Sequence, residues 1–312
     1  MAVQVGQLYQ TLELKDKNFS SGLKSAKNGV GSLSNMMKVG LAGAAVAGVA
    51  AAGRALTRLG SKSLHEFSRM EKGMAEVTTL IPDATEEMTD KMIDDLQSFN
   101  MEMGTLSDDS IPALYQSLSA GVPKENVFNF METAQKAAKG GVTDLTTAVD
   151  GLSSVVNAYG DDVVNATDVS DDMFTAVRLG KTTFEEMSGS LSDVVPIASA
   201  MGIEFSNIAA ALATTTSQGI STAESTTQLR QAITELSKEG STAYDAFMSV
   251  AGEAFPEFIR SGGNLQEAMS IMAQAARDNN TSVQNMFANI RGGQAALALT
   301  GGAAKTFAEN LN

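Results

Sequence analysis

The chain has 312 residues, a length that suits one or two domains with a sizeable core. It contains no cysteine, which excludes disulfides, thiolate metal sites and cysteine nucleophiles. Tryptophan is also absent and aromatic residues make up 5% of the chain, so methionine, alanine and leucine must fill the apolar positions. Such side chains favour close helix packing over an aromatic-lined ligand pocket.

The net charge of −14 is distributed unequally along the chain. Residues 1–62 carry eight basic and two acidic side chains, so the remainder has a net charge of −20. This acidic body argues against nucleic-acid binding, because phosphate contacts need Lys and Arg, and we expect no specific nucleic-acid sequence recognition. The basic stretch is interpreted either as a solvated tail or as a segment that meets an acidic partner, an anionic membrane or DNA.

The first 60 residues divide into two predicted segments. Residues 1–38 form a basic N-terminal segment, in which a short strand before a helix is one interpretation that the periodicity does not decide. Residues 39–60 predict a Gly/Ala-rich apolar helix, since 39–53 are uncharged and almost entirely Gly, Ala and Val. This run is short for a membrane span, and two alternatives stay open: a tightly packed helix within an oligomer, or transient membrane insertion.

Residues 61–312 predict an all-α fold, a multi-helix array of short to medium helices with Gly and Pro breaks. Pro123 is expected in the first turn of a helix, and Pro196 is expected to kink or break one. Several helices are expected to begin with a capping box, in which a small polar residue precedes Glu by three positions. These pairs are Ser63 and Glu66, Asp83 and Glu86, Thr183 and Glu186, Ser221 and Glu224, and Asn264 and Glu267.

Apolar residues recur along these helices at spacings of three and four, which predicts one buried face on each. The stripes contain Met88, Met92, Leu96, Phe99 and Met103; Ile111, Leu114, Tyr115 and Leu118; Leu145, Val149, Leu152, Val156 and Tyr159; Leu229, Ile233 and Leu236; and Ala268, Ile271, Met272 and Ala275.

A helical hairpin is predicted to occur twice, in residues 119–160 and 194–240. In each copy a glycine follows each apolar stripe, where a helix commonly ends on a left-handed residue. The corresponding glycines are Gly121, Gly141 and Gly160 in the first copy and Gly202, Gly219 and Gly240 in the second.

Few residues in the sequence are candidates for catalysis or for phosphate or metal binding. The single histidine, His65, has no second His four residues later and is interpreted as a structural or surface residue. Residues 301–306, GGAAKT, are interpreted as a helix linker, because Leu299 and Ala304 stand where a phosphate-binding loop needs glycine.

An acidic cluster lacks the central Gly and closing Glu of an EF-hand, and is interpreted as a solvated loop with helix caps. Its members are Asp161, Asp162, Asn165, Asp168, Asp171 and Asp172. The sequence predicts no catalytic, cofactor-binding or metal-binding residue.

Three long stretches resemble the helical core region of phage tail tape measure proteins. They read SLSAGVPKENVFNFMETAQKAAKGGVTDLTTAVDGLSSVVNAYG, FEEMSGSLSDVVPIASAMGIEFSNIAAALATTTSQGISTAESTTQLRQAI and SVQNMFANIRGGQAALAL. The opening LELKDKNFSSGLKSA and the Gly/Ala run are also similar to the way such proteins begin. The resemblance covers about residues 60–300, so the chain is identified as a member of this family.

This resemblance implies a structural virion protein that is not an enzyme and needs no cofactor. Family members lie in several copies in the tail tube lumen, set tail length during assembly in the bacterial cytoplasm, and are released on DNA ejection. The implied partners are further copies of the chain, the tail tube protein, tail assembly chaperones, tail-tip or baseplate proteins and, through 39–53, the host membrane. As a single helix the chain would span at most about 470 Å, and it is interpreted as a fragment of a longer protein.

Two other functions are kept as alternatives. The first is a membrane-active helical protein that forms or assists a channel in the host envelope, suggested by 39–53 beside the basic segment. The second is an enzyme such as a wall hydrolase, for which no recognisable insert is present in the sequence.

Overall fold

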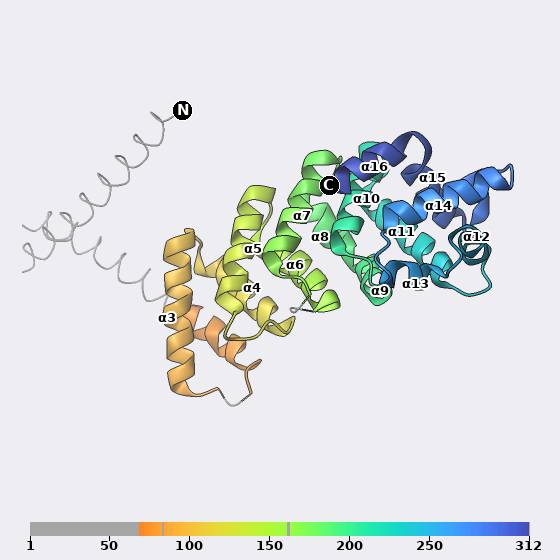
Figure 1. Cartoon of the computed structure of the whole chain (residues 1–312). Helices are drawn as coiled ribbons and strands as arrows, with labels where there is room; N and C mark the ends of the chain where they lie inside the picture. Colours follow the sequence, from red (N-terminus) through yellow and green to blue (C-terminus); the bar gives the residue numbers. More distant parts are fainter. Residues whose placement is uncertain (1–68, 83, 161–162, 312) are drawn as a thin grey trace, which may run out of the picture. The chain divides into compact units, whose positions relative to one another are not determined.

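Helices joined by short connections make up the described part of the chain (Figure 1). The computed structural model describes residues 69–82, 84–160 and 163–311. No strand occurs among them, which confirms the all-α prediction. The suggested N-terminal strand, the helix over 39–60, His65 and the box of Ser63 and Glu66 lie outside the described residues.

A helix over residues 69–78 is followed by a long series of helices. Those up to the middle of the chain are α3 (Glu86–Met103), α4 (Ser107–Ser119), α5 (Val127–Gly141), α6 (Leu145–Tyr159), α7 (Ala166–Leu179), α8 (Phe184–Ser190), η1 (Leu191–Asp193) and α9 (Val195–Met201). The remainder are α10 (Phe205–Ser217), α11 (Thr222–Ser237), α12 (Thr242–Ala251), α13 (Phe255–Arg260), α14 (Leu265–Asp278), η2 (Val283–Met286), α15 (Ile290–Leu299), η3 (Gly301–Ala303) and α16 (Ala304–Leu311).

Within Ser68–Asn312, most helices belong to two layers (Figure 1). The first layer contains α3, α5, α7, α10 and α16, each in contact with the next in this order. The second contains α4, α6, α8, α11 and α15, again each in contact with the next. Because the early helices alternate between the layers, each helix packs on its sequence neighbours and on the helix two places away, as in helical repeat proteins.

The apolar stripes form the interior between these layers. On α6, Leu145, Val149 and Leu152 are buried as predicted, and the stripe of α11 is buried as well. The predicted buried face of α4 is wrong by part of a turn: Tyr115 is 40% exposed, whereas Ala113 lies in the core.

Helix α10 is buried on every side, from Asn207 to Thr216. Its three consecutive threonines satisfy their hydroxyl groups inside the same helix: Thr214 donates to the Ala210 carbonyl at 2.8 Å, and Thr216 to that of Leu212 at 2.7 Å. This back-bonding lets a polar sequence occupy the centre of the array without orphaned donors.

The predicted helix starts are confirmed where the whole capping box forms. At α8, the Thr183 hydroxyl accepts from the Glu186 N–H while the Glu186 carboxylate accepts from the Thr183 N–H. Asn264 and Glu267 make the same reciprocal pair at α14. Two orphan donors are satisfied at each of these starts.

Two other predicted starts need correction. Ser221 caps α11 as expected, but the Glu224 carboxylate accepts from the Gln228 side chain instead of closing the box. The box of Asp83 and Glu86 is wrong: Thr85 is the N-cap, its hydroxyl accepting from the Met88 N–H. Thr85 precedes Met88 by three positions, the same spacing as Asp83 before Glu86. Thr85 is therefore an equally suitable N-cap by spacing alone.

Of the two predicted proline positions, that of Pro196 is confirmed and that of Pro123 is wrong. Pro196 lies in the first turn of α9, after a break at Val194 that the sequence predicted. Pro123 is not in a helix: it opens a turn in which its carbonyl accepts from the Asn126 N–H, and α5 begins only at Val127. Pro112 lies inside α4, a position that the sequence analysis did not single out.

Five of the six predicted helix-ending glycines have positive φ, a conformation that favours glycine, and Gly160 combines it with an extended ψ of 142°. These are Gly121, Gly160, Gly202, Gly219 and Gly240. Gly141 is the exception, since it is the last residue of α5 and Val142 takes the left-handed position with φ 54°. A Cβ on Gly141 would lie 2.6 Å from the Phe184 Cβ, so glycine is needed here for close packing of α5 on α8.

We expect Val142→Gly to raise the free energy of unfolding by about 1 kcal/mol, because a β-branched residue is strained at positive φ. Val142 is 91% exposed, so the substitution removes little packing. The urea midpoint at constant slope measures the effect, with Val142→Ala as control, which should gain less. A lower midpoint for the glycine variant would contradict the left-handed conformation.

Candidate interaction surface

The sequence-level candidates for phosphate and calcium binding have structural roles. In 301–306, Gly301–Ala303 form a 3-10 turn that links α15 to α16, as predicted, but Ala304 to Thr306 begin α16 and are not linker. Lys305 makes an ion pair with Glu309 at 3.4 Å on that helix.

Asn165 confirms the interpretation of the acidic cluster as a place of helix capping. Its side-chain oxygen accepts from the N–H groups of Thr167 and Asp168, both at 3.0 Å, and its amide donates to the Asp168 carboxylate at 2.7 Å. Asp161 and Asp162 lie outside the described residues. Among residues that the structure describes, no three His, Cys, Asp or Glu side chains are grouped so that they could hold a metal ion.

Asp172 is the titratable group of this cluster with the most perturbed environment. Burial raises its pKa to about 6, helped by the charges of Asp168, Asp171 and Glu204. It lines a small cavity between α7, α10 and α16, with Ala209, Ala210 and Ala213 among the other lining residues. The folded state therefore binds more protons at Asp172 than the unfolded chain between about pH 4 and 6, and stability falls as the pH rises through this window.

We expect Asp172→Asn to stabilise the protein by about 1 kcal/mol above pH 7, a value reduced for partial solvent exposure. The gain should shrink as the pH falls and vanish well below pH 3.8, where the carboxyl is neutral in both the native and the unfolded state. Urea unfolding at pH 4.5 and 7.5 makes the comparison, and Asp90→Asn on the exposed side of α3 is the control. An equal gain at both pH values would contradict the raised pKa.

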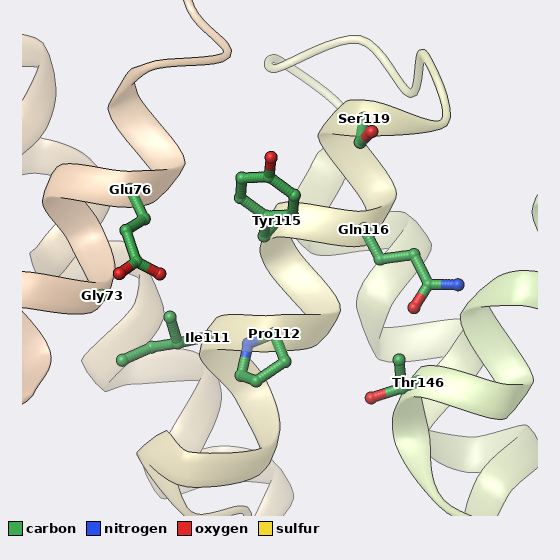
Figure 2. Close-up of a pocket in the computed structure, with 8 residues that line it drawn as sticks. All are labelled: Gly73, Glu76, Ile111, Pro112, Tyr115, Gln116, Ser119 and Thr146. Atoms are coloured by element: carbon green, nitrogen blue, oxygen red, sulfur yellow. The ribbon is translucent and has the colours of Figure 1, made fainter.

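An open groove crosses the second layer, over the helix of residues 69–78, α4 and α6. Its first stretch has a volume of about 450 Å³ and is lined mainly by apolar groups. Figure 2 shows Glu76 on one side, Gln116 and Thr146 on the other, and Tyr115 between them. The lining residues are Gly73, Glu76, Ile111, Pro112, Tyr115, Gln116, Ser119 and Thr146.

A second stretch of about 630 Å³ continues the first towards α8, since Gln116 and Thr146 line both. The Gln116 amide donates to the Asp150 carboxylate at 3.2 Å and ties α4 to α6 at this junction. The other lining residues are Thr147, Glu185, Glu186, Gly189 and Ser190. We call the two stretches together the acidic groove, because four carboxylates and no lysine or arginine line them.

Local sequence accounts for the side chains and the helix spacing at the first stretch of the groove. A Cβ on Gly73 would lie 2.7 Å from the Ile111 Cγ2, so glycine allows the helix of residues 69–78 to approach α4 closely. Pro112 is exposed and carries no N–H, and Tyr115 follows one turn later at the groove. Sequence reasoning missed this surface, because Tyr115 was assigned to the core; Pro112 inside an apolar stripe was the available signal.

Stacked helices that present an extended groove are typical of structural proteins that bind other proteins. No solved structure matches the chain. The model of the family described as "Phage-related minor tail protein" matches residues 93–290, which include most of the described helices. The chain therefore belongs to the phage-related minor tail protein family.

One protein similar to this chain is the "Probable tape measure protein" of Clostridium phage phiCD119, which is 30% identical over 264 residues. The similarity covers 80% of this chain and 27% of the relative, so the chain spans about a quarter of that protein's length. The chain is thus similar to part of a phage tail protein. Within the described residues, no helix is both long enough and apolar enough to cross a membrane, and 39–53 lie outside them.

Proposed function

We propose that this chain is the N-terminal helical part of a tail tape measure protein. In this role it lies in the tail tube lumen of the virion, takes part in setting tail length during assembly, and is released when DNA is ejected. The similarity to the phage phiCD119 protein over 264 residues is the observation that carries the proposal. The proposed activity is structural and involves no catalysis and no cofactor.

The proposed roles of the segments follow from their charge and fold. The basic residues 1–38 and the apolar 39–60 precede a folded helical region over 61–312 with repeated hairpins. The acidic helical region provides surfaces for proteins and avoids the DNA that follows it through the tube, since like charges repel. Its proposed partners are the tail tube protein, tail assembly chaperones, tail-tip or baseplate proteins, and further copies of the chain.

Tail length tests this proposal directly. An insertion of about 70 strongly helical residues after Asn312, in the reading frame of the phage gene, should lengthen tails by about 100 Å, because a helix rises 1.5 Å per residue. A matched insertion of half that size should lengthen them by about half as much. Electron microscopy of negatively stained particles measures both.

The two insertions also separate length setting from mere tolerance of extra residues. A proportional increase supports the ruler role of the protein to which this chain belongs. Normal particles whose tails keep their original length in both mutants would contradict it, while leaving membership in the tail protein family unaffected.

A further inference from the structure

The acidic groove combines an apolar floor with a rim of carboxylates. Ile111, Pro112 and Tyr115 supply the floor, and Tyr115 is 40% exposed. Glu76 is exposed on one side of Tyr115 (Figure 2), and Asp150 is exposed at the junction of the two stretches. Tyrosine is enriched where proteins bind one another, because its ring covers apolar groups while its hydroxyl stays hydrated. The floor is therefore suited to contact with another protein.

The rim charges are not neutralised from within the described part of the chain. The ion pairs between described residues join other groups, such as Lys136 with Glu132 and Arg291 with Glu224. None of them includes Glu76, Asp150 or Glu185. A cationic partner therefore gains ion pairs at the rim without breaking any that these residues already make.

The charge of the helical region narrows the class of occupant. The described residues include 14 lysines and arginines against 30 aspartates and glutamates, so a second copy of this region brings more carboxylates than cations. Nucleic acid brings phosphates, which the rim repels. A small molecule would stay largely exposed in an open groove. A segment of a different protein that carries lysine or arginine complements the rim.

The floor favours a helix as that segment. Ile111 and Tyr115 lie one turn apart on α4, and residues of the opposite face, Ala113, Leu114 and Ser117, are buried in the core. Side chains one turn apart form a ridge, into which the apolar side chains of a second helix fit at the same spacing. The groove thus has the features of a surface that takes the apolar face of an amphipathic helix.

We infer that the acidic groove binds a basic amphipathic helix of another protein. The apolar side chains of that helix pack on Ile111 and Tyr115. Its lysine or arginine side chains pair with Glu76, Asp150 and Glu185. This binding is a property of the described helical region alone, so a negative result of the tail-length experiment would leave it unaffected.

Fluorescence anisotropy with a defined peptide tests the binding. The probe is a fluorescein-labelled peptide of about 18 residues, or five helical turns, with leucine at every third or fourth position and lysine on the flanks. The full 312-residue chain should bind it saturably, with one peptide per chain. A peptide of the same composition with its leucines spread around the helix should bind about tenfold more weakly, because it lacks an apolar face. Equal affinities for the two peptides would show attraction by charge alone and overturn the proposal.

Charge reversal tests the rim. Glu76→Lys with Asp150→Lys should weaken binding of the probe about tenfold, because two attractive charges become repulsive. The matched control, Glu125→Lys with Glu239→Lys, changes the net charge equally at exposed sites outside the groove and should keep the affinity within about twofold. Equal weakening in the two double variants would place the probe elsewhere on the acidic surface and contradict the proposal.

A single substitution tests the floor. Tyr115→Ser should weaken binding of the probe about fivefold and should do so at high salt as well, because the lost contact is apolar. Leu106→Ser is the control, since Leu106 is 71% exposed and lies outside the groove. Circular dichroism confirms that each variant is folded. An unchanged affinity of the folded Tyr115→Ser variant would exclude the groove as the binding site.

Discussion

Replacing Glu235 by alanine is expected to lower the free energy of unfolding by about 3 kcal/mol. The Glu235 side chain lies on α11 and is 8% exposed. Its carboxylate accepts hydrogen bonds from the N–H groups of Ala288 at 2.8 Å and Asn289 at 2.5 Å, in the connection between η2 and α15. Alanine would leave both donors without an acceptor, each at a cost of about 1–3 kcal/mol if water cannot reach it.

Urea unfolding measures the loss, and hydrogen exchange locates it. Glu235→Gln keeps one acceptor oxygen and should lose about half as much, while Glu239→Gln on the exposed surface should be neutral. Exchange should become faster at the start of α15 in the alanine variant and remain slow in α5 and α6. A variant as stable as the parent would mean that the two N–H groups are satisfied without Glu235.

Gly293→Ala is expected to be at least as damaging, with a loss of about 3 kcal/mol or more. A Cβ at this position would lie 2.6 Å from the Gln284 carbonyl oxygen and 3.1 Å from the Gln284 Cα. Both atoms belong to the backbone of η2, so no side-chain rotation relieves the clash, and α15 must move away from η2 and from its contact with α11.

Gly189→Ala provides the matched control. Gly189 lies in α8, and a Cβ there meets no atom within 4 Å. Alanine should therefore stabilise the helix by about 0.5–1 kcal/mol through its higher helix propensity. Thermal melts followed by circular dichroism should show opposite shifts for the two glycines. Equal shifts would contradict the close approach of α15 to η2.

Signals that act within one or two turns predicted much of this fold. Thr183 with Glu186 and Asn264 with Glu267 place helix starts correctly, because the partners of a capping box are three residues apart and need no tertiary contact. Gly202 and Gly219 end helices with positive φ for the same local reason. The all-α class follows from many such signals in agreement.

What depends on contacts between distant residues could not be predicted in this way. Gly141 looked like a helix-ending glycine, but its role is set by Phe184, a residue more than forty positions later. Tyr115 matched a buried stripe, yet it is 40% exposed, and Ala113 and Leu114 occupy the core-facing positions of α4. The acidic groove requires Glu76, Gln116 and Asp150 to meet across three helices, and no spacing in the sequence encodes that meeting.

The layered order of contacts has a mechanical consequence. Because α3, α5, α7, α10 and α16 touch in series, and α4, α6, α8, α11 and α15 do likewise, a pulling force applied between the two ends of the described region is transmitted through successive interfaces, and the weakest of them yields first. Helices detach successively under such a load, and the resisting force is set by the weakest interface rather than by the sum of all of them. The region therefore behaves under tension as a chain of small elastic links.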